Sequence, residues 1–249
     1  MAILVFEHTN TCRAERLGRT LRDYGHKLRV LRLHDGDAVP SDLDDVDGVI
    51  SCGGPQAAYD DSVPFLAAEM ARMREAHALG IPVVGICLGC QILARALGGK
   101  VENMGANQIE FGFTEVKLTP AGREDIIHAG IAWNAMMFQH HRDQVTQAPP
   151  GARVLASSAR CKVQTWALGL RTYGLQHHPE VGNQTIENWI SNDPEALRDS
   201  NLTPQQAREQ VQKHFAAFER LSDRLFESIS LYLMPVDRRY KGLVKDLHH

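Results

Sequence analysis

The feature that most limits the fold is an alternation, in the first half of the chain, of short apolar runs with segments of helical periodicity. Strand-like runs occupy residues 2–6, 26–33, 47–52 and 81–87. Helical spacing follows over residues 12–24, about 63–79 and 88–97. Parallel strands need a long crossover between them, usually a helix. The order therefore predicts an α/β fold with a mostly parallel central sheet and helices on both faces.

The second half of the chain has a different pattern. Short strand-like pieces, which could extend the sheet or form a local antiparallel layer, lie at residues 113–119, 152–157, 161–168 and 172–177. From Thr203 onward the sequence is typical of a helix, because Thr203, Pro204 and Gln206 form a capping-box pattern. Its apolar face is expected to pack on the core rather than to bind a partner as a zipper. We expect a single domain, residues 1–249, with a core of about residues 1–190 and a helical C-terminal extension over residues 191–249.

Composition excludes several classes of protein. The chain has 249 residues, of which 43% are hydrophobic, and a net charge of −3, which argues against a general nucleic-acid or anionic-membrane surface. It contains no apolar run of about 18 residues, and its first residues do not resemble a signal peptide. The five cysteines are scattered without a disulfide framework, which favours a reducing cytoplasm.

Two of these cysteines, Cys87 and Cys90, lie in the stretch VVGICLGCQILARALGG. A structural metal site needs more ligands than one C-x-x-C pair, and the sequence has neither a second such pair nor histidines at finger spacing. We therefore expect no metal. A redox C-x-x-C pair at the start of a helix remains an alternative.

The residues around Cys87 favour a nucleophile at a sharp turn. Residues 85–89, G-I-C-L-G, have the form Gly-x-nucleophile-x-Gly between a strand and a helix. Cys87 would project from the edge of the sheet, where the helix N-terminus favours its thiolate. The amide of Leu88 would be free to donate to an oxyanion. Cys90, one turn later, is expected to pack in the core.

A thiolate nucleophile needs a base, and the base needs an orienting group. The segment GLQHHPEV, residues 174–181, ends a strand with two histidines, and Glu180 follows His178 by two residues. The chain has 12 histidines, so one histidine alone carries little information. A His-Pro-Glu sequence at the end of a strand is far more specific, and it makes His178 and Glu180 the candidates for base and orienting carboxylate.

Three segments, GGPQAAYDD (53–61), PVVGICLGCQILARALGG (82–99) and GLQHHPEV, together resemble class I, triad-type glutamine amidotransferase domains. The resemblance covers roughly residues 46–190 and is greatest to free-standing, GMP-synthase-like amidotransferase proteins. It implies a flavodoxin-like fold and a reaction without cofactor. Cys87 would attack the side-chain amide of glutamine to form a glutamyl thioester, and water would then release glutamate after ammonia leaves. His178 would be the base and acid, and Glu180 would orient it.

The resemblance also implies further site residues. Gly53 and Gly54 correspond to the loop whose backbone amide completes the oxyanion hole, so Gly54 and Leu88 are the expected donors. Gly53 and Gln91 correspond to residues in contact with the substrate. His141 is a further expected contact, because FQHHRDQV resembles the family's His-Gly-Asp region near the backbone groups of glutamine.

The sequence departs from the family pattern at some positions. Arg142 stands where the family has glycine, and His177 stands where phenylalanine is common. We interpret His177 as a packing residue in the wall of the site. As a second titrating group beside the base, it could alter the pH profile of the activity. Glu110 and Gly112 resemble a family segment near the site, with a surface or turn role as an equal alternative.

Several functions are compatible with these observations. The leading hypothesis is an enzyme that hydrolyses the side-chain amide of glutamine. Because the chain lacks a G-x₄-G-K-[ST] phosphate loop, either its ammonia passes to a separate synthetase or the protein is a free-standing hydrolase. The second is a γ-glutamyl peptidase or hydrolase that acts on a γ-glutamyl conjugate. The third is a catalytically silent regulatory or binding subunit, which the intact Cys87, His178 and Glu180 disfavour. A redox role for Cys87 and Cys90 comes last, because it leaves the His-Pro-Glu sequence unexplained.

Overall fold

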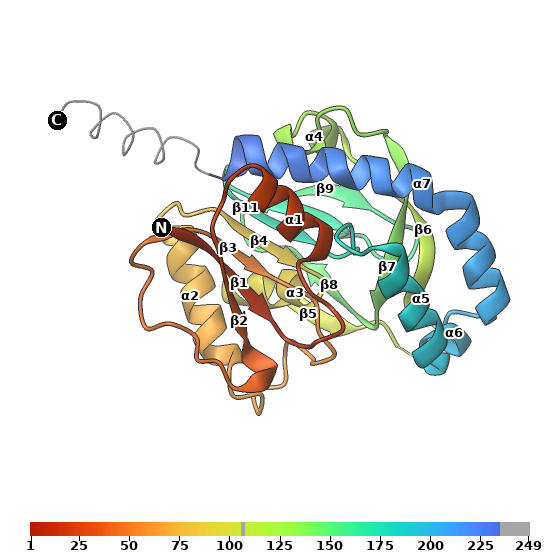
Figure 1. The fold of residues 1–249 in the computed structure, drawn as a ribbon, viewed down its shortest axis with the longest axis horizontal. Helices are drawn as coiled ribbons and strands as arrows, with labels where there is room; N and C mark the ends of the chain where they lie inside the picture. The colour runs from red at the N-terminus through yellow and green to blue at the C-terminus, as the bar shows by residue number, and fades with distance from the viewer. Residues whose placement is uncertain (106–107, 235–249) are drawn as a thin grey trace.

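The computed structural model describes residues 1–105 and 108–234. In these residues a nine-stranded sheet has the order β2-β1-β3-β4-β11-β10-β9-β6-β7 (Figure 1). The first five strands in this order run parallel to one another: β2 (Leu28–Arg32), β1 (Ala2–Glu7), β3 (Val46–Ser51), β4 (Val83–Ile86) and β11 (Thr172–Leu175). The predicted α/β fold with a parallel central sheet is confirmed.

The remaining strands of the main sheet pair in antiparallel fashion: β10 (Thr165–Leu168), β9 (Arg153–Ser157), β6 (Glu110–Leu118) and β7 (Asn134–His141). The strand-like pieces of the second half therefore extend the main sheet. A separate two-stranded antiparallel sheet joins β5 (Lys100–Asn103) to β8 (Asp143–Gln147).

Helices cover both faces of the sheet. α2 (Leu66–Ala78) and α3 (Leu88–Ala96) pack on one face, and α1 (Glu15–Asp23) and α7 (Pro204–Ser228) pack on the other. β1 shows the cause, because successive side chains of a strand point to opposite faces. Leu4 and Phe6 join the core under α2 and α3, whereas Ile3 and Val5 join the core under α1 and α7.

Shorter elements fill the connections: α4 (Pro120–Arg123), α5 (Asn183–Asn192), α6 (Pro194–Asp199), 3₁₀ turns at Leu33–Asp35 and Ile126–His128, and a π-helical turn at Ile229–Leu233. α5 and α7 enclose a third core against β6 and β7, in which Phe138, Trp189 and Phe218 are buried. None of the helices within the described residues combines the length and the apolar character that crossing a membrane requires.

The long helix α7 begins as the sequence predicts. The Thr203 hydroxyl accepts a hydrogen bond from the Gln206 amide (3.2 Å), and the Gln206 side chain accepts one from the Thr203 amide (2.9 Å). Phe218, Leu225 and Ile229 are buried, so the helix packs on the core. Residues 235–249 of the expected C-terminal extension lie outside the described residues.

Candidate active site

The carboxyl ends of neighbouring parallel strands bring the predicted site residues together. Cys52, Gly53 and Gly54 follow β3, Cys87 follows β4, and His178 and Glu180 lie just beyond β11. Adjacent parallel strands place the segments that follow them side by side, which is where open α/β sheets bind ligands.

Cys87 occupies a strained turn between β4 and α3. Its backbone has φ 51° and ψ −107°, a conformation that residues with a side chain rarely adopt. A Cβ atom on Gly85 would overlap the Gly89 carbonyl, and one on Gly89 would overlap the Ser51 carbonyl. The predicted sharp turn and its need for both glycines are therefore confirmed. The Cys87 thiol faces the His140 carbonyl oxygen at 3.7 Å.

His178 and Glu180 form a buried pair. His178 Nδ1 lies 2.7 Å from Glu180 Oε1, and both side chains are almost completely shielded from solvent. Because a carboxylate only accepts, Nδ1 donates and Nε2 is the nitrogen left for chemistry. Burial by itself lowers the pKa of His178, but the Glu180 carboxylate and the sulfurs of Cys87 and Cys12 outweigh burial, so its pKa is raised well above the usual value.

The loop that carries Glu180 is fixed by the start of α1. The Arg16 amide donates to the Glu180 carbonyl oxygen (3.2 Å). The Glu15 carboxylate accepts hydrogen bonds from the Gly182 amide (2.9 Å) and the Thr185 hydroxyl (2.6 Å). The Trp189 ring packs edge-on against the His178 ring, with centroids 5.0 Å apart. These contacts fix the position of the His178 ring relative to the Glu180 carboxylate.

Gly53 lies where the cysteine and the histidine meet. A Cβ atom there would lie 2.9 Å from His178 Cε1 and 3.5 Å from Cys87 Cβ. It would also lie 2.6 Å from Cys12 Sγ, closer than real Cβ atoms approach. Only glycine therefore fits between these three side chains.

Gly54 N–H, in the loop after β3, and Leu88 N–H, in the first turn of α3, are among the backbone amides at this junction that have no acceptor within residues 1–105 and 108–234. A Cβ atom on Gly54 would lie 2.8 Å from Leu88 Cδ2, so the loop packs directly against the helix start. The Gly89 amide joins the two segments by donating to the Cys52 carbonyl (3.0 Å).

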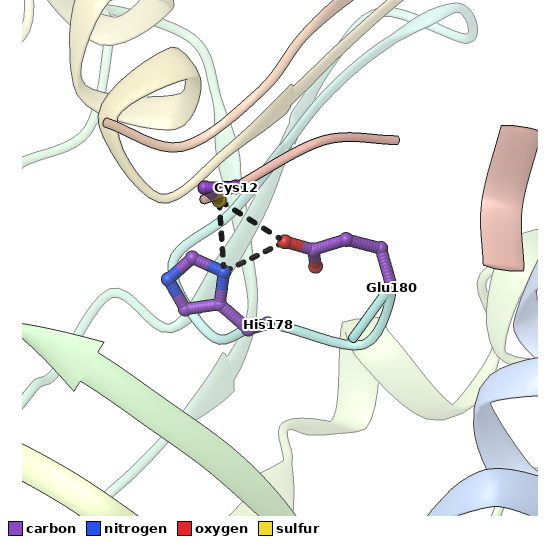
Figure 2. A group of neighbouring side chains, drawn as sticks. All are labelled: Cys12, His178 and Glu180. Carbon is purple, nitrogen blue, oxygen red and sulfur yellow. Dashed lines mark hydrogen bonds and ion pairs between the residues drawn. The ribbon is translucent and has the colours of Figure 1, made fainter. Parts of the chain in front are cut away.

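Cys12 is a site residue that the sequence reasoning missed. Its sulfur lies 3.9 Å from His178 Nδ1 and 3.7 Å from Glu180 Oε1 (Figure 2). Burial raises the pKa of Cys12 to about 12, against a smaller opposing effect of His178. The only sequence signal is its position shortly after the first strand, and that signal gains meaning only once the strand order is known.

The same three side chains have the spacing of a possible metal site, since their ligand atoms lie within 4.8 Å of one another. Thiolate, imidazole and carboxylate are ligands that suit zinc. Two ligands of one tetrahedral zinc would lie about 3.3 Å apart for nitrogen and oxygen. The observed 2.7 Å between Nδ1 and Oε1 is a hydrogen-bond distance instead. As it stands, this geometry is that of a histidine held by its carboxylate.

A cavity of about 460 Å³ opens at the junction, lined in part by Gly54, Gln91, His141 and His178. The Gln91 amide donates to the Asp143 carbonyl (3.0 Å) and to the Gln176 side chain (3.3 Å). The predicted contacts of Gln91 and His141 with substrate stay predictions, although both residues border the cavity.

Glu110 supports His141. His141 Nε2 lies 3.0 Å from the Glu110 carboxylate, and its Nδ1 lies 3.0 Å from the Asp143 carbonyl. Ser158 and Gln164 also donate to Glu110, each at 2.7 Å. Glu110 is buried, so the alternative of a surface role for it is wrong.

Other predicted features find plain structural roles. Cys90 is fully buried and accepts a hydrogen bond from the Trp166 ring nitrogen (3.2 Å), and burial raises its pKa. Cys90 thus packs in the core, as expected. Burial, with neighbouring histidines, lowers the pKa of His177 to about 3, so this ring is uncharged near pH 7 and serves as a buried packing residue. Arg142 is held by Asp199 at 2.7 Å.

The family model and the curated relatives that match this sequence point to the same family. The sequence model of the family described as glutamine amidotransferase class-I matches residues 13–193. The chain is 33% identical over 184 residues to the GMP synthase (glutamine-hydrolyzing) of Aeropyrum pernix, an alignment that covers 72% of this chain and 34% of that protein. It is 35% identical over 166 residues to the enzyme of the same name from Limosilactobacillus reuteri, with 66% and 30% covered. The chain spans about a third of the length of the curated relatives it matches.

Comparison with solved structures agrees. A glutamine amidotransferase from Thermotoga maritima has a TM-score of 0.80 and 25% identity, with 93% of this chain and 98% of that chain covered. One from Methylobacillus flagellatus has a TM-score of 0.81 and 26% identity, with 95% and 97% covered. The residues matched by the family, 13–193, include Cys87, His178 and Glu180 but neither His8 nor Cys12.

Proposed function

The chain belongs to the class-I glutamine amidotransferase family of cysteine-dependent enzymes, and on that premise we propose that it hydrolyses the side-chain amide of glutamine through a thioester on Cys87. The observation that carries the proposal is the meeting of the strained Cys87 turn with the buried His178–Glu180 pair across Gly53. A nucleophile, a base and an orienting group lie within one small junction.

The reaction follows from the positions of these groups. Cys87 Sγ attacks the amide carbon, and the former carbonyl oxygen becomes an oxyanion that accepts from Gly54 N–H and Leu88 N–H. His178 Nε2 gives its proton to the departing ammonia, which leaves a γ-glutamyl thioester. Water then attacks the thioester, passes a proton to His178 and expels the sulfur, so that the products are glutamate and ammonia.

Cys87, rather than Cys12, is the proposed nucleophile. Cys12 lies against Nδ1, the nitrogen already bonded to Glu180, so the ring cannot use its free nitrogen on this sulfur. With a pKa of about 12, Cys12 is a neutral thiol near pH 7. Cys87 stands on the turn whose geometry presents a side chain at the edge of the sheet.

We also propose that residues 1–249 act as one domain and that ammonia passes to a separate acceptor protein. The relatives named GMP synthase (glutamine-hydrolyzing) support an ammonia acceptor, because their name couples glutamine hydrolysis to a synthesis. The intact Cys87, His178 and Glu180 disfavour the alternative of a silent subunit.

A γ-glutamyl conjugate is a second candidate substrate, and the size of the cavity favours it. At about 460 Å³ the cavity is within the range of sites for ligands larger than an amino acid, about 300–1,000 Å³. It extends past His178 along α5, where Asn188 and Asn192 line it, and on to Asp193. An amine larger than ammonia could lie in this extension.

A substrate panel on the purified chain, with glutamate release as the readout, tests the proposal. Glutamine, γ-glutamyl dipeptides and γ-glutamyl amides of simple amines are compared with Cys87→Ser as the control. We expect wild-type turnover on at least one class and none for Cys87→Ser. Glutamate release that survives in Cys87→Ser, or no release from any substrate by the wild type, would contradict the proposed function.

A further inference from the structure

A second buried histidine–glutamate pair lies next to the Gly53–Gly54 loop. His8 Nε2 lies 2.9 Å from Glu69 Oε2, and neither side chain has any exposed surface. The Ser51 hydroxyl donates to the other oxygen of Glu69 at 2.6 Å. The Phe65 ring stacks on the His8 ring, with centroids 5.4 Å apart, which fixes the plane of the imidazole. A buried, charged network of this kind is costly unless its groups are well bonded.

The other nitrogen of His8 faces the loop. His8 Nδ1 lies 3.1 Å from the Cys52 carbonyl oxygen and 3.4 Å from the Gly53 carbonyl oxygen. Carbonyl oxygens only accept, so Nδ1 carries a proton and donates to both. Burial lowers the pKa of His8, but Glu69 and the two carbonyls outweigh it and raise the pKa overall. One ring thus links Glu69 to two consecutive carbonyls of the loop.

This link determines which way a peptide group points. The described backbone has no cis peptide, so the C=O and N–H of the Gly53–Gly54 peptide point in opposite directions. With its oxygen held toward His8, the peptide turns its N–H away from His8, and Gly54 lines the cavity. Because glycine on both sides permits other backbone conformations, the peptide could rotate if it were not held.

We propose that His8 and Glu69 are positioning residues that hold the Gly53–Gly54 peptide with its N–H toward the oxygen of the substrate amide. This inference rests on the proposed function, in which that N–H receives the oxyanion. Cys52 adds to the restraint, because its carbonyl also accepts from Gly89 N–H in α3 (3.0 Å). The donors of the site are thereby fixed before substrate arrives, which is the condition under which they lower a barrier most.

Two substitutions of His8 separate this role from simple packing. The amide nitrogen of an asparagine can take the place of Nδ1, and that of a glutamine can take the place of Nε2. His8→Asn therefore keeps a donor for the loop and loses Glu69, whereas His8→Gln keeps a donor for Glu69 and loses the loop. His128→Gln is the matched control, because His128 is a buried histidine that also bonds a carbonyl, that of Gly122 (3.0 Å), through Nδ1.

Three measurements are made on each variant. They are kcat and KM with the best substrate of the panel, the inhibition constant of glutamate γ-semialdehyde, and the rate of Cys87 alkylation by iodoacetamide followed by mass spectrometry. The aldehyde forms a hemithioacetal with Cys87 whose oxygen occupies the position of the oxyanion, so it reports on the donors. Alkylation reports on the cysteine alone.

Removing one oxyanion donor costs about 10²- to 10³-fold in kcat. A donor that is loosened rather than removed should cost less, so His8→Gln should lower kcat about 10- to 10²-fold, with KM within about 3-fold. Aldehyde affinity should fall by a similar factor while alkylation of Cys87 is unchanged. His8→Asn should recover part of the loss, because it keeps the donor to the loop but not the anchor that Glu69 provides, and His128→Gln should leave the aldehyde affinity unchanged.

Equal effects of His8→Gln and His8→Asn, or an unchanged aldehyde affinity in His8→Gln, would overturn the inference. If His8→Gln does not fold, Ser51→Ala takes its place, because it removes only the hydroxyl that donates to Glu69. This variant should weaken aldehyde binding by a larger factor than it slows the alkylation of Cys87. Equal factors for the two measurements would overturn the inference. A wild type without turnover on any substrate contradicts the proposed function. An active wild type with an unimpaired His8→Gln contradicts this inference alone.

Discussion

His178 Nδ1 and Glu180 Oε1 lie 2.7 Å apart, and this single hydrogen bond decides which nitrogen of the imidazole is left to act on substrate. The bonded nitrogen, which Cys12 also approaches, is committed to the carboxylate. The opposite nitrogen is the one that can move a proton, so the chemistry is expected on the side of Cys87.

Glu180→Gln should lower kcat about 10- to 10³-fold with little change in KM. Neutralising the acid of a serine triad costs about 10⁴-fold, and a thiolate depends less on its base. The Glu180 carboxylate raises the pKa of His178, whereas burial lowers it. Without the carboxylate the ring loses its proton at lower pH, so the alkaline limb of kcat/KM should move to lower pH. Steady-state kinetics across pH test this, and an unmoved alkaline limb at wild-type turnover would show that Glu180 does not act on His178.

Cys87→Ser should abolish glutamate release while the fold survives. An alkylating glutamine analogue should label Cys87 and spare both Cys12 and Cys90, since burial raises the pKa of each of these two thiols. Cys12→Ser should keep most of the turnover, because this sulfur faces the wrong nitrogen. Peptide mapping of the labelled protein is the measurement. Stoichiometric modification of Cys12 or Cys90 with Cys87 intact would reverse the assignment.

Cys90→Ala should keep most of the activity and lose stability. The Trp166 ring N–H would lose its acceptor in a fully buried position, which costs about 1–3 kcal/mol. Activity assays and denaturant unfolding measure the two effects separately. A loss of turnover as complete as that of Cys87→Ser, in a folded protein, would revive the redox C-x-x-C interpretation.

His177→Phe should make folding less sensitive to acid. The pKa of His177 is about 3 in the folded protein and about 6.5 in an unfolded chain, so the unfolded state binds more protons between these values. Stability due to the neutral ring is therefore complete above about pH 6.5 and is lost as pH falls, with a slope of up to about 1.4 kcal/mol per pH unit. Unfolding curves of both proteins between pH 4 and pH 7, where phenylalanine should remove this slope, are the test. The same slope in both proteins would mean that His177 is charged in the folded state.

Sequence alone was sufficient for residues whose chemistry is written in a short motif. The glycines around Cys87 predicted the turn, and the spacing of His178 and Glu180 predicted their pairing, because both relations are local along the chain. The capping residues of α7 were predicted for the same reason.

Relations across the sheet were not predictable in this way. His8 and Cys12 follow β1, and Glu69 lies in α2, so their meeting with the loop after β3 depends on strand order. Glu110 was open to a surface or turn role because it precedes the strand predicted at residues 113–119, whereas β6 begins at Glu110 itself. In the sheet it lies directly opposite His141 on β7, and that register explains its burial. Such pairings between distant segments carry no signal in one sequence read without its fold.

The contact between Gly89 and the Ser51 carbonyl has an evolutionary consequence. A Cβ atom on Gly89 would first meet the Ser51 backbone, and one on Gly85 would first meet the Gly89 backbone. Because the nearest atoms are backbone atoms, a flexible side chain cannot adjust to a change in the distance between these segments. The end of β3 and the Cys87 turn must then be exchanged together when related genes recombine. In chimeras assembled from two family members, functional crossover points should fall outside residues 51–89, and crossovers between the two glycine motifs should be selected against.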